Sequence, residues 1–210
     1  DRMVIANATG CSSVYASTFP FNPYHDPWVN SLFQDTPAVA KGLFEGITAS
    51  AADDIKALRI AALELEDAYQ PAIHDRYFRM FAWNEFTPQE LAMLPTAFSV
   101  GGDGATYDIG FGALSRLLTT STPIKVMVLN TGAYSNTGGQ ASTASLTGQD
   151  SDLTRFGAAH AGKQEDRKEL GLIAAFHPNV FVAQTSTALQ GHFLGNVMEY
   201  LNYTASPAVL

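Results

Sequence analysis

The sequence predicts an α/β fold: a doubly wound, mostly parallel sheet with helices on both faces. One observation is that short apolar runs of strand length alternate with stretches of helical periodicity along the chain. The other is that a polar, glycine-rich loop follows each of two successive runs, at residues 98–100 and 124–129. In an open parallel sheet such loops meet at the carboxyl edge, where ligands bind.

The predicted strands and helices alternate from one end of the chain to the other. Apolar runs predict strands at residues 3–6, 98–100, 124–129, 180–183 and 207–210. Helical periodicity predicts helices at residues 109–118, 152–161 and 189–203, the last with an apolar side of Phe193, Leu194, Val197, Met198 and Leu201. Residues 15–35 are rich in aromatics, proline and asparagine, which predicts an extended loop.

A helical insertion is predicted at residues 36–96. Apolar residues recur at helical spacing over residues 51–69, and Pro71 is expected to end or kink that helix. A second helix with an aromatic stripe is expected over residues 72–86. The Thr-Pro-Gln-Glu of residues 87–90 is a typical helix start. The charges of the insertion are most simply a solvated face, so we assign it a scaffolding role.

The two glycine-rich loops carry the chemistry. Gly102 and Gly104 flank a single acid, Asp103. Glycines let backbone N–H groups approach phosphate oxygens, and the helix that follows points its positive end at them. Asp103 can supply a carboxylate oxygen to magnesium, while Thr131, Asn136 and a loop carbonyl can supply neutral oxygens. The loops therefore predict a diphosphate and a hard cation; the alternative interpretation is a pair of ordinary turns.

Two polar segments follow the second glycine-rich loop. Residues 141–150 are small and polar, which predicts a mobile loop over the cofactor. Residues 163–168 carry dense charge, which is most simply solvated surface.

Composition limits the class of protein. The chain has 210 residues, enough for one domain with a real core, and we predict a single domain over residues 1–210. Its 12 basic and 20 acidic residues give a formal net charge of -8, which argues against nucleic acid or anionic membrane as a partner. One cysteine excludes an internal disulfide and fits a reducing, cytoplasmic compartment. The chain begins without methionine and stops inside an apparent strand, so we expect a fragment of a longer polypeptide.

Four blocks of sequence closely resemble, in the same order, the C-terminal thiamine-diphosphate domain of pyruvate:ferredoxin (flavodoxin) oxidoreductases. The blocks are residues 5–13 (IANATGCSS), 28–35 (WVNSLFQD), 102–140 with its GDG, YDIGFG and YSNTGGQ motifs, and 156–163 together with 170–174. They cover most of the chain except roughly residues 36–96. Four ordered blocks are a far more specific match than any one of them.

The resemblance implies thiamine diphosphate and Mg²⁺ as cofactors and gives six residues a role near them. These are Asp103 and Thr131 as magnesium ligands, Ala133 as a magnesium ligand through its backbone carbonyl, Gly102 and Gly104 as the diphosphate cradle, and Asn136 as a catalytic residue near the diphosphate and the substrate.

Cys11 is implied to be a cluster ligand. A lone cysteine is, without context, most simply a small buried apolar side chain. In the family the matching cysteine binds the 4Fe-4S cluster nearest the thiamine cofactor, with partners from an upstream Cys-x-x-Cys and a downstream cysteine. Neither is among these 210 residues. A cluster of this type needs about four thiolates, so we expect one only where the missing flanking cysteines are supplied.

The activity implied by the resemblance is the oxidative decarboxylation of pyruvate with coenzyme A to acetyl-CoA and CO₂. Electrons would pass through iron–sulfur clusters to ferredoxin or flavodoxin, and the remaining domains of the parent polypeptide and a second copy in a homodimer would be partners. The family also needs a glutamate against the aminopyrimidine ring, for which this chain has no candidate. We therefore expect the isolated chain to be inactive.

Two other functions remain open. The second hypothesis is a non-redox thiamine-diphosphate decarboxylase or synthase, against which the Cys11 block and the block order argue. The third is a non-catalytic interaction domain that has kept the fold, which a loss of magnesium-dependent thiamine diphosphate binding would support.

Overall fold

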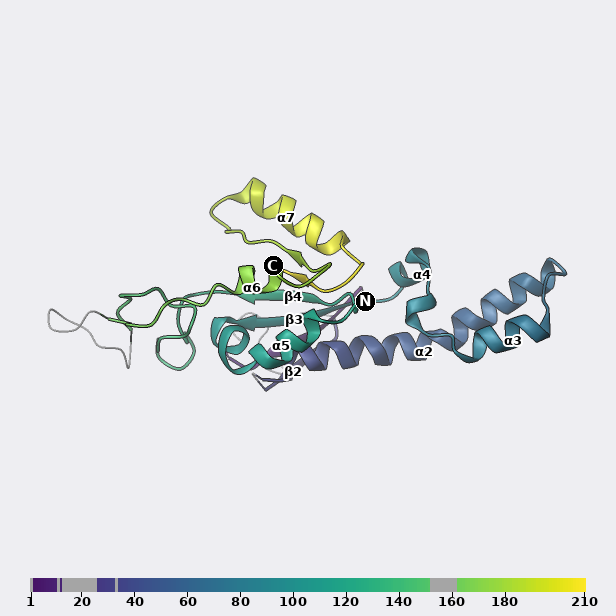
Figure 1. Cartoon of the computed structure of the whole chain (residues 1–210), viewed down its shortest axis with the longest axis horizontal. Coiled ribbons are helices and arrows are strands. Elements are labelled where there is room, and N and C mark those ends of the chain that lie inside the picture. Colours follow the sequence, from purple (N-terminus) through teal and green to yellow (C-terminus); the bar gives the residue numbers. More distant parts are fainter. Residues whose placement is uncertain (1, 11, 13–25, 33, 152–161) are drawn as a thin grey trace.

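A six-stranded parallel sheet forms the centre of the computed structural model (Figure 1). The structure describes residues 2–10, 12, 26–32, 34–151 and 162–210. The strands are β1 (Met3–Ala8), β2 (Trp28–Ser31), β3 (Thr96–Gly102), β4 (Lys125–Leu129), β5 (Phe181–Val182) and β6 (Ala208–Val209). Their order across the sheet is β2-β1-β3-β4-β6-β5, and every pair is parallel.

The strand order reverses direction next to β1. From β1 the chain moves outward to β2 and then returns to the other side of β1 to form β3. The carboxyl ends of β1 and β3 are therefore neighbours whose connections leave in opposite directions. Such a switch point opens a crevice in which doubly wound proteins bind ligands.

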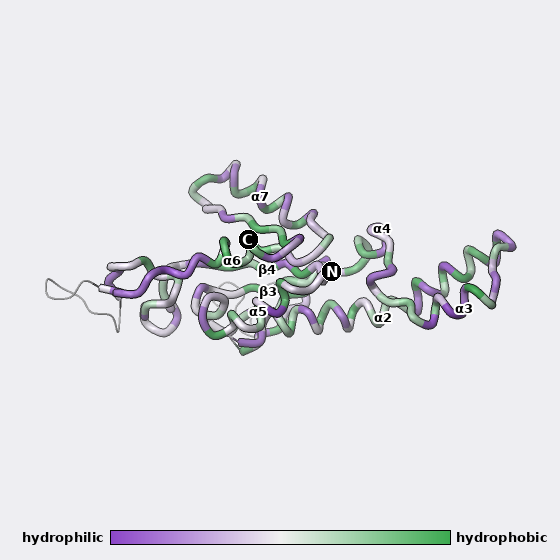
Figure 2. Tube along the Cα trace, in the orientation of Figure 1, coloured by the Kyte–Doolittle hydropathy of each residue, from purple (hydrophilic) through white to green (hydrophobic). Residues whose placement is uncertain are grey.

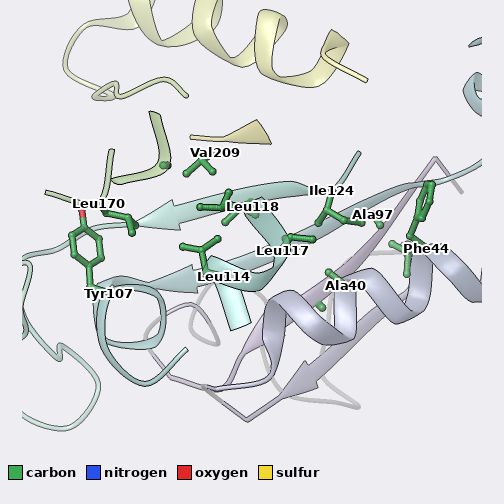
Figure 3. Close-up of a cluster of buried hydrophobic side chains, with 14 of the residues drawn as sticks. Ala40, Phe44, Ala97, Tyr107, Leu114, Leu117, Leu118, Ile124, Leu170 and Val209 are labelled. Atoms are coloured by element: carbon green, nitrogen blue, oxygen red, sulfur yellow. The ribbon is translucent and has the colours of Figure 1, made fainter. Parts of the chain in front are cut away.

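Helices cover both faces of the sheet, as the sequence predicts. On one face, α2 (Thr36–Leu65), α5 (Phe111–Leu118) and α6 (Leu170–Ala175) pack against the strands (Figure 3). Leu114, Leu117 and Leu118 of α5 are almost fully buried there. Complete burial of such a side chain contributes about 1.5–3 kcal/mol each, so α5 is a main anchor of this face.

The opposite face carries a smaller apolar cluster beneath α7 (Gln190–Asn202). Tyr200 is fully buried against Phe98 of β3. The rest of the expected apolar side of α7 is less covered, because Leu194, Met198 and Leu201 are exposed by 61%, 59% and 41%. The helix is where the sequence predicts it, but much of its apolar side faces outward.

Segment 36–96 is helical, although its helix boundaries differ from the predicted ones. The first helix, α2, is 30 residues long and ends at Leu65, before Pro71. Pro71 instead begins α3 (Pro71–Arg79), because proline at the first turn of a helix loses no intrahelical hydrogen bond. The second predicted helix, residues 72–86, is divided into α3 and the short 3₁₀ turn η1 (Trp83–Glu85).

The predicted helix start at residues 87–90 is confirmed in α4 (Pro88–Ala92). The Thr87 hydroxyl accepts from the Glu90 backbone N–H at 3.2 Å, and a Glu90 carboxylate oxygen accepts from the Thr87 N–H at 2.7 Å. Together these contacts satisfy donors that the first turn of a helix otherwise leaves unpaired.

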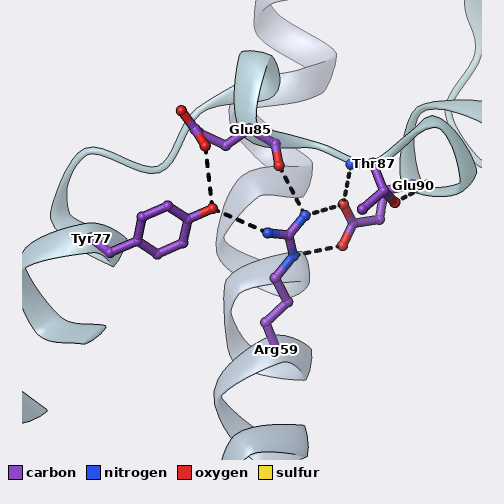
Figure 4. A network of polar contacts seen from close by, with 5 residues as sticks. All are labelled: Arg59, Tyr77, Glu85, Thr87 and Glu90. Atoms are coloured by element: carbon purple, nitrogen blue, oxygen red, sulfur yellow. Dashed lines mark hydrogen bonds and ion pairs between the residues drawn. The ribbon is translucent and has the colours of Figure 1, made fainter. Parts of the chain in front are cut away.

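The far half of α2 projects beyond the sheet together with α3 (Figure 1). One arginine of α2 connects α2 and α3 to the segment that begins α4 (Figure 4). Arg59 of α2 donates to Glu90 through Nε at 2.8 Å and Nη2 at 2.5 Å, to the Glu85 carbonyl at 2.9 Å, and to the Tyr77 hydroxyl at 3.2 Å. The guanidinium lowers the pKa of Glu90 to about 2. This network fixes α2 against η1, α3 and α4, and the scaffolding role stays a prediction.

Two further predictions concern residues 15–35 and residues 152–161. The prediction of an extended loop over residues 15–35 is wrong at β2, where Asn30 pairs with Asn7 of β1 and no apolar run marks the strand. The predicted helix at residues 152–161 lies outside the described residues. No helix in the described part of the chain is long and apolar enough to cross a membrane.

Candidate functional site

A cleft opens at the switch point of the sheet, next to the carboxyl ends of β1 and β3. It encloses about 360 Å³, its open mouth included. Its walls come from the turn after β1, the turn after β3 and the loop after β4: Ala8, Gly10, Ser12, Gly102, Gly104, Ala105, Tyr134, Asn136 and Thr137. The predicted cradle glycines and the predicted catalytic asparagine therefore line one cleft.

The three predicted magnesium ligands lie together. Asp103 follows the last residue of β3 and is 1% exposed. Its Oδ1 lies 3.2 Å from the Thr131 hydroxyl and 3.4 Å from the Thr131 backbone N. The same hydroxyl lies 3.1 Å from the backbone carbonyl oxygen of Ala133. One carboxylate, one hydroxyl and one carbonyl thus gather oxygens from two separate loops.

This set of donors suits a hard cation. Magnesium prefers oxygen ligands, and in cofactor sites it usually takes few carboxylates and completes its octahedron with phosphate and water. In the described residues no three His, Cys, Asp or Glu side chains gather as a metal site. The oxygens at Asp103 therefore suit a cation that arrives with a phosphate ligand better than a metal held by protein alone.

Gly104 is a position where only glycine fits. Asp103 and Gly104 open a wide helical turn, η2 (Gly104–Ile109), that leads into α5. A Cβ atom on Gly104 would lie 2.2 Å from the ring of Tyr134, which packs directly over the glycine. The Tyr134 hydroxyl donates to Asp108 at 2.6 Å, and burial together with that carboxylate raises the pKa of Tyr134. The turn after β3 and the loop after β4 are thereby held against each other.

The loop after β4 is folded back on itself. Tyr134 and Gln140 form an antiparallel bridge, with the Tyr134 N–H donating to the Gln140 carbonyl at 2.8 Å. Gly138 and Gly139 adopt φ values of 131° and 93°, which other residues rarely do. The turn presents Asn136 and Thr137 to the cleft.

Residues 141–150, predicted to be a mobile loop over the cofactor, form a hydrogen-bonded strap across the loop that follows β4. The Ser145 hydroxyl and the Gln149 amide both donate to the Gly132 carbonyl, at 2.6 Å and 2.9 Å. Ser142 donates to Asp103 Oδ2 at 2.5 Å. The hydroxyls of Ser142 and Ser145 are consumed in internal hydrogen bonds, and the mobility of the segment stays a prediction.

The interpretation of residues 163–168 as solvated surface is wrong for Lys163. Figure 2 shows these residues as a hydrophilic run leading into α6. Yet Lys163 is 5% exposed, and its ammonium donates to the Ser145 carbonyl at 2.7 Å. Lys168 donates to the Tyr107 carbonyl and lies 4.4 Å from the centre of the Phe111 ring. Two lysines of the run thus fasten the strap and η2.

Sequence reasoning missed Ser142 and Asp108, which orient the predicted site residues. Ser142 lies outside the motifs, and Asp108 lies within the YDIGFG motif without a role assigned to it. Their partners lie 39 and 26 residues away in the chain. The only sequence signal of Ser142 is its position in the polar segment that follows the second glycine-rich loop. Cys11, the predicted cluster ligand, lies outside the described residues.

Comparison with known proteins adds to this geometry. Residues 91–189 match the family described as thiamine pyrophosphate enzyme, C-terminal TPP binding domain. The chain is 35% identical over 214 residues to a probable pyruvate-flavodoxin oxidoreductase of Escherichia coli, covering 90% of this chain and 18% of that protein. It is 33% identical over 228 residues to the pyruvate:ferredoxin oxidoreductase of Moorella thermoacetica, covering 89% and 19%.

The chain contains a domain of this thiamine pyrophosphate enzyme family, at residues 91–189. It spans about a fifth of the length of these curated relatives. A solved 2-oxoglutarate:ferredoxin oxidoreductase from Magnetococcus marinus shares the fold, with a TM-score of 0.61 at 16% identity over 99% of this chain and 53% of that one. The matched range of the thiamine pyrophosphate enzyme family contains all six residues with predicted cofactor roles, from Gly102 to Asn136.

Proposed function

We propose that this chain is the thiamine-diphosphate- and Mg²⁺-binding domain of a 2-oxoacid:ferredoxin or flavodoxin oxidoreductase that acts on pyruvate. The observation that carries the proposal is the meeting of Asp103, Thr131 and Ala133 beside a glycine-lined cleft, within the range that matches the thiamine pyrophosphate family. The names of the relatives support pyruvate as substrate and ferredoxin or flavodoxin as acceptor.

Different residues of the chain would bind the cation and the diphosphate of the cofactor. Asp103 and Thr131 would bind the cation through their side chains and Ala133 through its carbonyl, so that positive charge stands where the diphosphate is anionic. Gly102 and Gly104 would let the backbone approach the diphosphate closely. Bound thiamine diphosphate supplies the stabilisation of negative charge on the substrate carbon when CO₂ is lost.

Asn136 would act at the open side of the cleft. It lies in the bridged turn that faces the cradle glycines across the cleft. A side-chain amide there can donate to a substrate oxygen as negative charge develops on it. Tyr134, fixed by Asp108, would hold the turn in register with the cradle.

The proposal extends to the architecture and the partners. Residues 1–210 would form one cofactor domain, in which residues 36–96 are a helical insertion. Cys11 would bind a 4Fe-4S cluster together with cysteines supplied by the remaining domains of a longer polypeptide. Coenzyme A would accept the acetyl group, the active form would be a homodimer, and a reducing cytoplasm would protect the cluster.

The test is an anaerobic assay on the complete gene product. Pyruvate-dependent reduction of a viologen dye is measured with and without coenzyme A, in the wild type and in Asp103→Ala. Reduction that requires coenzyme A and disappears in the variant supports the proposal. Release of CO₂ without dye reduction would identify a non-redox thiamine enzyme. No turnover, with cofactor and clusters bound, would refute the enzymatic proposal.

A further inference from the structure

The two carboxylate oxygens of Asp103 have different surroundings. Oδ1 faces the hydroxyl and the backbone N–H of Thr131, on the side where the Ala133 carbonyl lies. Oδ2 points the other way and accepts a hydrogen bond from Ser142 Oγ at 2.5 Å. Only Oδ1 is therefore directed toward the other candidate cation ligands.

The proton of the Ser142 hydroxyl is committed to Asp103. Ser142 Oγ accepts from the Ala144 backbone N–H at 3.1 Å, so its single proton is left to point at Oδ2. Ser142 is 3% exposed, which excludes bulk water as a competing partner. The hydrogen bond is thus built in one direction only, from serine to carboxylate.

Hydrogen bonds within the strap fix the backbone of Ser142. The Ser142 backbone N–H donates to Ser145 Oγ at 2.9 Å, and Ser145 Oγ donates in turn to the Gly132 carbonyl at 2.6 Å. The Ser145 carbonyl accepts from the buried ammonium of Lys163 at 2.7 Å. Every link in this chain of bonds comes from a described residue that is buried or partly buried, so the hydroxyl has little freedom to turn away.

We propose that Ser142 is a positioning residue that keeps Asp103 a one-oxygen ligand and thereby sets the preference of the site for Mg²⁺ over Ca²⁺. This inference rests on the proposed function. Magnesium requires near-octahedral geometry and fits a carboxylate that binds through one oxygen, whereas calcium takes six to eight ligands and readily uses both oxygens. A hydrogen bond that occupies Oδ2 disfavours the second arrangement. Outer hydrogen-bond partners of this kind tune metal sites without touching the metal.

The test measures cofactor retention rather than turnover. The complete gene product is stripped of metal, and retention of thiamine diphosphate on ultrafiltration is titrated with Mg²⁺ and separately with Ca²⁺. The variants are Ser142→Ala, which removes the hydroxyl, and Ser142→Thr, which keeps it. Ser145→Ala is the matched control, because it loosens the strap without removing a partner of the Asp103 carboxylate.

The quantity compared between variants is the ratio of the Mg²⁺ and Ca²⁺ concentrations that give half-maximal retention of thiamine diphosphate. In Ser142→Ala we expect the Mg²⁺ requirement to rise about 10-fold or more, the usual scale for an outer-shell partner, while the Ca²⁺ requirement changes less than about threefold. Ser142→Thr should restore the wild-type ratio, and Ser145→Ala should shift both cations alike.

Two outcomes would overturn the inference, and they differ from failure of the proposed function. An equal shift for both cations in Ser142→Ala would reduce Ser142 to a structural part of the strap. Wild-type half-saturating concentrations for both cations in Ser142→Ala would show that Asp103 does not depend on the serine. If the wild type retains no thiamine diphosphate with Mg²⁺, the proposed function itself fails and the inference fails with it.

Discussion

A buried lysine makes the stability of this chain depend on pH. Lys125, the first residue of β4, is 1% exposed and lies on the face of the sheet covered by α7. Its ammonium donates to the Tyr203 carbonyl at the end of α7 and lies 5.6 Å from the centre of the Tyr200 ring. Burial lowers the pKa of Lys125 to about 8.

The sign and size of the effect follow from proton linkage. An unfolded lysine has a pKa of about 10.4, so between about pH 8 and pH 10 the unfolded chain binds more protons than the folded one. The free energy of unfolding therefore rises with pH in this window. The lysine alone contributes a gain of about 2 kcal/mol between about pH 7.5 and pH 9.5, from 2.303RT per pH unit weighted by the difference in protonation.

The measurement is urea denaturation at several pH values in this window. Wild type is compared with Lys125→Met, which keeps most of the side-chain length without a titrating group. The control is Lys41→Met, which removes a partly exposed lysine paired with Glu45. The window stops below pH 10 because burial raises the pKa of Tyr200, whose own linkage has the opposite sign above that point. Equal pH slopes in wild type and Lys125→Met would refute the reasoning.

Three further predictions test the site and its supports. Gly104→Ala should weaken magnesium-dependent thiamine diphosphate retention at least about 10-fold while circular dichroism stays unchanged, because the new Cβ would displace the Tyr134 ring; Gly112→Ala, with nothing within 4 Å of its Cβ, is the silent control. Leu114→Ala should lower the free energy of unfolding by about 2–5 kcal/mol in urea denaturation, and a loss below about 1 kcal/mol would contradict the packing seen around α5. The pKa of Glu90 is lowered to about 2, so its contribution to stability is present above about pH 4.5 and lost as pH falls toward 2; Glu90→Gln should flatten that part of the acid-unfolding curve.

The sequence was informative where one local pattern decides the structure. Five of the six strands were predicted from apolar runs because buried parallel strands need continuous apolar residues. The strand β2 was missed because its side chains are mixed, and its place depends on pairing with β1 and on the contact between Asn7 and Asn30. A partner 23 residues away leaves no periodic trace in the sequence.

The candidate site shows the same division. Gly102, Asp103 and Gly104 are recognisable from their motif. Because the strands are parallel, the loop with Thr131 lies at the same carboxyl edge of the sheet. Ser142 and Lys163 gave no such signal, because a serine among small residues and a lysine in a charged run are normally solvated. Each is buried here by contacts to loops that lie 39 and 18 residues earlier in the chain.

The charge at Asp103 gives the last link between fold and function. The carboxylate is 1% exposed, and its hydrogen bonds from Thr131 and Ser142 come from uncharged donors. None of the ion pairs between described residues includes Asp103. A buried carboxylate is costly unless a cation or several hydrogen bonds compensate it, and hydroxyl donors compensate it only in part. A divalent cation at Oδ1 would supply the positive charge and give the Thr131 hydroxyl and the Ala133 carbonyl a common partner. The site is thus arranged for a cation that binds with the cofactor, which predicts that Mg²⁺ and thiamine diphosphate bind cooperatively.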